Sequence, residues 1–178
     1  DGRYAGVSQN EDEKWPSYIG PGISNAGVKN NFYGLYVHDN ADGFSGFTAT
    51  DGDVDSSITM NNGGSGVNRC NGHGTYLQSK STNTRYVRRV MAINNFAAGI
   101  KIGAVSGPVI NYVLDRSILQ NGGAQCLRGT WGTTGQGVQT LDIVTDGLPI
   151  QNATASNNVI WGNPKSATHV AFFGYVNS

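Results

Sequence analysis

Val90-Met91-Ala92-Ile93-Asn94-Asn95, followed by Gly99-Ile100-Lys101-Ile102, is the stretch that decides the fold of this chain. It joins a short apolar run to a pair of asparagines, and then to a glycine and a second apolar run. Similar phrases recur as Leu35-Tyr36-Val37-His38-Asp39-Asn40, Ser57-Ile58-Thr59-Met60-Asn61-Asn62-Gly63, Ser117-Ile118-Leu119-Gln120-Asn121-Gly122-Gly123 and Asn158-Val159-Ile160-Trp161-Gly162-Asn163. Imperfect repeats of 20 to 50 residues are typical of solenoids, in which each copy adds one coil to a shared core.

The spacing of the repeats is uneven. Successive anchors are 23, 33, 26 and 42 residues apart when they are taken as Asp39, Asn62, Asn95, Asn121 and Asn163. Coils whose strands stack on one another but whose corner loops differ in length would produce this variation. The last interval is either one coil with a long loop or two coils, and Val138 to Val144 is the candidate strand for the extra coil.

The residue types of the phrase suit a sharp corner between strands. Asparagine adopts the left-handed conformation at low cost, and its side chain can bond the equivalent asparagine of the next coil. Polar and apolar residues alternate with one slip from Tyr86 to Ile93, and Ile100 and Ile102 face the side opposite Lys101. We therefore predict an all-β, right-handed parallel β-helix of about five to seven irregular coils.

The prediction treats residues 1–178 as a single domain, with an irregular segment at 1–27 and a loop excursion at 124–137. An antiparallel sandwich or jelly roll is the competing fold, because it also has many short strands and turns. Asn62-Gly63, Asp51-Gly52 and Asn121-Gly122 would then be hairpin turns.

Composition narrows the classes of function. The 178 residues have a formal net charge of zero, only 13% are charged, and 26 are glycine. Without a basic stripe, the attraction that drives nucleic-acid binding is missing, so no nucleic-acid partner is expected. No apolar run is long enough for a transmembrane helix.

Two cysteines, Cys70 and Cys126, suggest one disulfide and an oxidising compartment, with two separate buried thiols as the alternative. Asn152-Ala153-Thr154 is an N-glycosylation sequon, which has meaning only in a eukaryotic source. A secreted or cell-surface protein is the expectation.

Four phrases between Arg3 and Gly123 resemble one known family. They are Asn40-Ala41-Asp42-Gly43-Phe44, Met60-Asn61-Asn62-Gly63-Gly64, Gly72-His73-Gly74-Thr75-Tyr76-Leu77-Gln78-Ser79 and Asn94-Asn95-Phe96-Ala97-Ala98-Gly99-Ile100. In order and spacing the chain resembles bacterial right-handed β-helix proteins of the pectin-lyase-like superfamily, many of which have no assigned activity. Thr75 and Ser79 stand where that pattern prefers Ile and Asn, and no N-terminal cap is evident. The resemblance implies the fold, and fold alone does not imply function.

His73 and Tyr76 are the leading catalytic candidates, as a pair for proton transfer on a sugar, like that of lyases of related folds. On a regular strand they would not share a face, so a corner at Gly74 is needed to bring them together. The structural alternative is that Gly72 and Gly74 make a tight corner while both side chains only hold loops by hydrogen bonds.

His38 and Asp39 form a second candidate catalytic pair, with Asp42 close by as a candidate carbohydrate contact. The alternative is a polar ladder at a corner. The polygalacturonase pattern of adjacent aspartates with Arg-x-Lys does not occur in the sequence. Lys101 and Trp131 are further candidate carbohydrate contacts, Trp131 as a platform on a Gly/Thr-rich loop.

Asp51, Asp53 and Asp55 place alternate carboxylates on one side of an extended segment, which would suit Ca²⁺, the candidate cofactor. The EF-hand's glycine and glutamate are absent, with Ser56 and Asn62 in their places, so a solvated acidic loop is the alternative.

Two functions remain open. One is an extracellular β-helix protein that binds polysaccharide and, as an enzyme, cleaves it as a lyase or a glycoside hydrolase. It predicts a groove with two carboxylates, or a basic residue near Tyr76. The other is a structural or adhesive subunit that stacks end to end through its β-helix ends into a fibre or appendage.

Overall fold

The structure, a computed structural model, describes residues 21–25, 27–40, 42–46, 52–63, 73–78, 82–95, 98–104, 109–120, 122, 140–161 and 170–176. These residues form strands and turns, and none of them is helical. The low content of strong helix formers and the abundance of glycine and asparagine explain this outcome. The all-β prediction is therefore confirmed for the described part of the chain.

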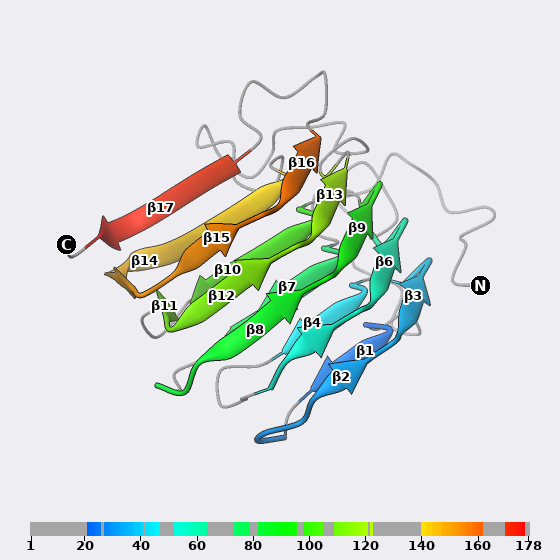
Figure 1. Cartoon of the computed structure of the whole chain (residues 1–178), viewed down its shortest axis with the longest axis horizontal. Helices are drawn as coiled ribbons and strands as arrows, with labels where there is room; N and C mark the ends of the chain where they lie inside the picture. The colour runs from blue at the N-terminus through cyan, green and yellow to red at the C-terminus, as the bar shows by residue number, and fades with distance from the viewer. Residues whose placement is uncertain are drawn as a thin grey trace, which may run out of the picture.

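The strands assemble into three sheets (Figure 1). Sheet A contains β1 (Ile23–Asn25), β4 (Phe44–Gly46), β7 (Thr75–Leu77), β10 (Ile100–Ala104), β11 (Val109–Ile110), β14 (Leu141–Gln151) and β17 (Val170–Val176). Sheet B contains β2 (Phe32–Tyr33), β5 (Val54–Asp55), β8 (Arg85–Arg88), β12 (Tyr112–Asp115) and β15 (Thr154–Ser156). Sheet C contains β3 (Tyr36–His38), β6 (Ile58–Met60), β9 (Met91–Ile93), β13 (Ile118–Gln120) and β16 (Val159–Trp161).

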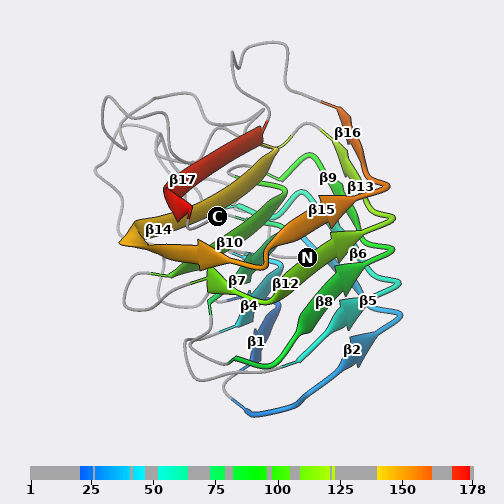
Figure 2. The same cartoon turned by 60° about the vertical axis from the view of Figure 1, so that its left-hand side comes forward.

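The chain visits the sheets in the order A, B, C and then returns to A, and we call one such passage a coil. Each strand pairs with the strand of the same sheet in the next coil, and every pairing among the described strands is parallel. Figure 2 shows the sheets side by side around a common interior. This arrangement is compatible with a parallel β-helix, and an antiparallel sandwich does not have it.

The coil lengths follow the predicted intervals closely. Hydrogen-bonded residues in neighbouring coils are separated by 22, 33, 27 and 41 positions in the sequence. The longest interval is a single coil, because β14 leads into β15 and β16 of the same coil. The strand foreseen at Val138 to Val144 therefore exists in part, as the start of β14, but it adds no separate coil.

The core lies between the three sheets and is formed by inward-facing residues of the described strands. It includes Phe44, Leu77, Ile100, Ile102, Leu141 and Ile143 from sheet A, Val54, Val87 and Leu114 from sheet B, and Ala92 and Leu119 from sheet C. Lys101 lies between two buried isoleucines and faces outward, as its alternation predicts. Burying one such aliphatic side chain contributes about 1.5–3 kcal/mol, so every coil helps to hold its neighbours.

A single residue makes the corner between sheets B and C in every coil. These residues all have positive φ, and they are Gly34, Ser56, Arg89, Arg116 and Asn157. The alternation from Tyr86 to Ile93 slips at Arg89 because the chain turns there. The residues that follow this corner are joined by hydrogen bonds between neighbouring coils. For example, the Ser117 hydroxyl accepts a hydrogen bond from Val90 N at 3.1 Å.

The corner after sheet C uses the two asparagines of the phrase for different tasks. Positive φ falls on the first of each pair, Asp39, Asn61 and Asn94. The ladder is made by the second: Asn95 Oδ1 accepts from Asn62 Nδ2 at 3.0 Å and from Asn62 N at 3.1 Å. The prediction aligned Asp39 with Asn62, which is wrong by one position. His38 pairs with Met60, so Asp39, the next residue, aligns with Asn61.

A column of glycines faces this asparagine ladder. A Cβ on Gly43 would lie 2.7 Å from Asn62 Nδ2, and a Cβ on Gly22 would lie 2.7 Å from Asn40 Nδ2. No real Cβ packs at that distance, so glycine precedes β1, β4 and β7, where the amide of the next asparagine corner along the chain occupies the space. This contact explains why asparagine and glycine recur together in the phrase.

Two further features concern the ends of the stack. Strand β1 lies inside the segment 1–27, for which irregular structure was expected, because Ile23 pairs with Phe44 and extends sheet A. Strands β1, β2 and β3 each have one neighbour, as the first members of their sheets among the described strands.

No described helix is long and apolar enough to cross a membrane.

Candidate functional site

Asp42 and His73 meet where the chain enters sheet A, on neighbouring coils. Gly43 N donates to His73 O at 2.9 Å, and this backbone contact places the two side chains side by side. Asp42 Oδ1 then accepts two hydrogen bonds from His73, from the backbone N at 2.8 Å and from the ring Nδ1 at 3.1 Å. His73 is buried, with 9% of its surface exposed, so the ring has little freedom.

Tyr76 lies against the His73 ring. The two ring centroids are 5.0 Å apart and the planes are tilted by 32°. Thr75 and Leu77 are buried, whereas Tyr76 between them faces away from the core. His73 lies before β7 and is not part of the strand, and its ring contacts that of Tyr76.

Lys101 completes the group from the next coil. It pairs with Tyr76 in the parallel register, and its Nζ lies 5.4 Å from the centre of the Tyr76 ring. An ammonium over an aromatic face is attracted by the ring quadrupole. We call Asp42, His73, Tyr76 and Lys101 the His73 cluster; it contains the basic residue near Tyr76 that the carbohydrate hypothesis predicts.

The His73 cluster combines three chemical capacities on the outer side of sheet A. An imidazole can accept a proton, a phenol can donate one, and an ammonium can pair with an anion. Four residues that are spread over 60 positions of sequence are adjacent because three successive coils stack in register. In the backbone register, Asp142 of β14 is the partner of Lys101.

His38 and Asp39 form the second predicted pair, and the structure places it on sheet C. His38 Nδ1 lies 2.8 Å from Asp39 Oδ2, and the His38 ring stacks on Tyr36 with centroids 4.6 Å apart. Tyr36 was not singled out from the sequence, although its position two residues before His38 places both on one face of a strand. No described contact joins this pair to Asp42 or His73.

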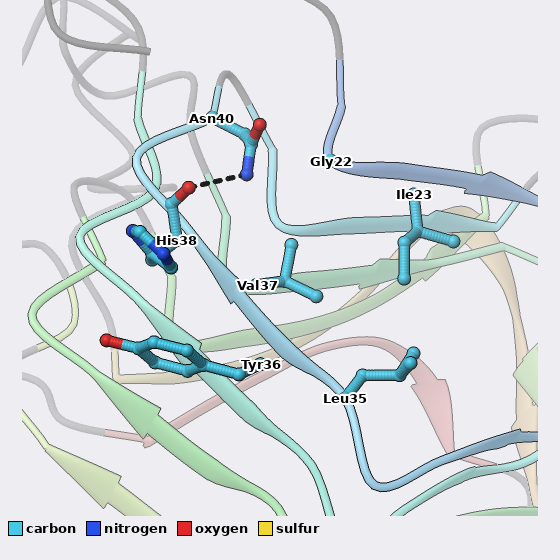
Figure 3. Close-up of a pocket in the computed structure, with 7 residues that line it drawn as sticks. All are labelled: Gly22, Ile23, Leu35, Tyr36, Val37, His38 and Asn40. Carbon is cyan, nitrogen blue, oxygen red and sulfur yellow. Dashed lines mark hydrogen bonds between the residues drawn. The ribbon is translucent and has the colours of Figure 1, made fainter. Parts of the chain in front are cut away.

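A concavity of about 330 Å³ opens at the first coil (Figure 3). Its lining is Gly22, Ile23, Leu35, Tyr36, Val37, His38 and Asn40. Figure 3 shows Leu35 and Val37 on one side of β3 and Tyr36 and His38 on the other. No member of the His73 cluster lines it, so the concavity and the densest group of reactive side chains lie at different places. We base the candidate site on the cluster, because shape without convergent chemistry defines no reaction.

The acidic segment of the calcium prediction is engaged with sheet B. Asp55 is buried and accepts a hydrogen bond from Arg88 Nε at 2.6 Å, and it also pairs with Arg89. Asp53 Oδ1 accepts from Tyr86 N at 2.9 Å. No set of three or more potential metal ligands occurs among the described residues, and Asp51 lies outside them.

The two arginines determine the charge state of Asp55. Burial by itself would raise the pKa of this carboxyl, but hydrogen bonds from Arg88 and Ser56 and the charges of Arg88 and Arg89 outweigh burial and lower it. The pKa of Arg88 is raised, chiefly by its hydrogen bond to Asp55. Sequence reasoning missed this group because Asp55 and Arg88 are 33 positions apart.

Several sequence candidates lie outside the described residues: Trp131, Asp51, Cys70 and Cys126. The platform role of Trp131 and the disulfide therefore stay predictions. Asn152 of the sequon is described and exposed, and its Nδ2 donates to Asn111 Oδ1 at 2.9 Å.

Comparison with known proteins identifies no relative. No family model matches the chain, and neither a curated protein nor a solved structure does. The resemblance to the pectin-lyase-like superfamily stays a prediction, and function is argued from the chain's own residues.

Proposed function

We propose that this chain is a right-handed parallel β-helix that binds extracellular polysaccharide along the outer side of sheet A. The single observation that carries the proposal is the His73 cluster, in which Asp42, His73, Tyr76 and Lys101 converge from three successive coils. Right-handedness follows from the strong preference of parallel strand crossovers for that hand. A parallel sheet whose stacked strands present side chains in register suits an extended sugar chain.

The chemistry of the cluster favours a lyase over a glycoside hydrolase as the catalytic version. A hydrolase needs two carboxylates across the scissile bond, whereas the cluster has one described carboxylate, Asp42, which is bonded to His73. In β-elimination on a uronate, a base removes the C5 proton, the C4–C5 double bond forms, and the C4–O bond breaks. The leaving oxygen then receives a proton from an acid.

His73, Tyr76 and Lys101 supply the required groups. In this proposal the imidazole of His73 accepts the C5 proton and the phenol of Tyr76 protonates the leaving oxygen. Lys101 pairs with the uronate carboxylate, which acidifies C5 by stabilising the negative charge that develops there. The ammonium lies close enough to the Tyr76 ring for one sugar to contact both residues.

The test is binding and product formation with a panel of neutral and uronate-containing polysaccharides. We expect binding of acidic chains and an unsaturated sugar at the new non-reducing end. Lys101→Gln should weaken binding of acidic chains by about tenfold, the equivalent of losing about 1.4 kcal/mol. Arg116→Gln is the matched control, because it removes one positive charge at the corner between sheets B and C and should leave the affinity unchanged. No binding to any member of the panel would refute the proposal.

A structural or adhesive subunit is the second candidate, and one observation favours it. Strands β1, β2 and β3 are the outermost described members of their sheets, and Tyr33 in β2 and Tyr36 in β3 are 68% and 56% exposed. Sheet edges of this kind template pairing with another chain. Light scattering and negative-stain electron microscopy at high concentration decide it: rods or filaments support end-to-end stacking, and a strict monomer refutes it.

A further inference from the structure

We infer that Asp42 is a positioning residue for His73 and not a contact for the sugar. The inference deepens the proposed function and rests on it for its catalytic part. Both described hydrogen bonds of the Asp42 carboxylate come from His73, and both end on the same oxygen, Oδ1. One fixes the backbone at the entry to sheet A, and the other fixes the ring.

The bond to the ring determines which nitrogen carries the proton. A carboxylate can only accept hydrogen bonds, so Nδ1 must donate to Asp42 Oδ1. In the neutral ring this leaves the lone pair on Nε2. Asp42 thus selects the tautomer in which Nε2 is the proton acceptor, and Nδ1 is not available to substrate.

The surroundings hold the ring in this orientation. His73 is buried, Tyr76 covers it at 5.0 Å, and its backbone is tied to Gly43 and, through Gly74 N and Ala98 O at 3.0 Å, to the next coil. A ring that is packed in this way cannot rotate to exchange its two nitrogens without breaking these contacts. The His38–Asp39 pair differs, because the His38 side chain is 39% exposed.

The first measurement is the tautomer of His73 from ¹⁵N and ¹³C chemical shifts of the imidazole, in the intact chain and at a pH where the ring is neutral. We expect the Nδ1–H form in the wild-type protein and loss of this preference in Asp42→Asn, whose amide can donate as well as accept. Asp115→Asn is the matched control: it makes the same charge change on sheet B and should leave the His73 tautomer unchanged. The Nε2–H form in the wild-type protein would overturn the inference.

The second measurement separates positioning from sugar binding. We expect Asp42→Asn to lower kcat by about 10²- to 10⁴-fold, the usual contribution of a general base, with glycan affinity almost unchanged. An equal loss of affinity would make Asp42 a sugar contact and overturn its assignment. If the wild-type chain bound no glycan, the proposed function would fail, while the tautomer measurement would still decide the role of Asp42.

Discussion

Asp55 is a buried carboxylate whose charge is stabilised by two arginines of the next coil. Its pKa is lowered, so the folded state binds the proton more weakly than the unfolded chain does. The stabilisation it provides is therefore complete above the unfolded aspartate pKa of about 3.9 and is lost as the pH falls through the lower, folded value.

Asp55→Asn should lower the free energy of unfolding at neutral pH by about 2 kcal/mol, the typical cost of losing hydrogen bonds to a charged group. It should also flatten the decline of stability below about pH 4, because the variant lacks the linked proton. Denaturant unfolding at several pH values measures both effects. An equally steep fall of the free energy of unfolding at acid pH in the wild type and the variant would contradict this assignment.

Gly74 and Gly34 are glycines for two different reasons: the first lacks space for a side chain, and the second has a positive φ. A Cβ on Gly74 would lie 2.6 Å from Thr59 Oγ1 and would also meet Asn95 and the Gly99 carbonyl, whereas nothing lies within 4 Å of one on Gly34, whose φ is 67°. Gly74→Ala should cost about 1–3 kcal/mol through overpacking. Gly34→Ala should cost about 1 kcal/mol through backbone strain alone. Thermal unfolding of both variants measures the difference, and equal costs would refute the packing argument.

At the scale of elements, the asparagine ladder joins sheet C of one coil to the next. Asn95 is fully buried, accepts from Asn62 N and Nδ2, and donates to Thr59 O at 3.1 Å. Asn40 at the end of the ladder is only partly buried, and its Nδ2 donates to His38 O. Asn95, which lies in the middle of the stack, therefore supports more buried polar groups than Asn40 does at its beginning.

Asn95→Ala should destabilise the protein by about 3 kcal/mol, because several buried donors and acceptors lose their partners. Asn40→Ala should cost about 1 kcal/mol, since water reaches the groups that it leaves. Urea unfolding with matched m-values tests the ranking. A larger loss in Asn40→Ala would show that the ladder contributes little to the interior.

The outer faces of the sheets differ in chemistry. Sheet B carries the pairs of Asp55 with Arg88 and of Asp115 with Arg116, whereas sheet C presents apolar side chains, of which Ile118, Val159 and Trp161 are 41%, 56% and 68% exposed. Successive side chains of a strand point inward and outward in turn, so each strand contributes outward-facing residues. Because the coils stack in register, these residues form a continuous column on the outer face of each sheet.

At the scale of the whole molecule, stability should be graded along the stack. Strands β7, β8 and β9 have neighbours on both sides, whereas β1, β2 and β3 have one described neighbour each (Figure 1). We expect amide hydrogen exchange to be about tenfold or more slower in the middle coil than in the first, because end strands open locally at lower cost. Protection of β2 and β3 that rises with protein concentration would instead support end-to-end stacking.

Much of the fold could be predicted from the residues themselves. The corner after sheet C places positive φ on Asp39, Asn61 and Asn94, and the amides that pack beside these corners require glycine opposite them, so this corner can be recognised in the sequence. The corner between sheets B and C cannot, because Ser56, Arg89 and Arg116 adopt positive φ there. The sequence predicts the repeat, the first three coil lengths to within one residue and the outward position of Lys101, whereas it left the last interval open as one coil or two. The contact between the His73 and Tyr76 rings was predicted only on the condition of a corner at Gly74, because three positions along a regular strand place two side chains on opposite faces.

Only the tertiary structure decided which residues of different coils meet. Asp42 with His73 and Asp55 with Arg88 are 31 and 33 positions apart, and their contact depends on the exact register between coils whose loops differ in length. A shift of one residue, such as that between Asp39 and Asn40 as the first member of the ladder, exchanges the inner and outer faces. Hydrophobic patterning specifies that coils stack, whereas packing and hydrogen bonds across coils select the register that assembles the His73 cluster.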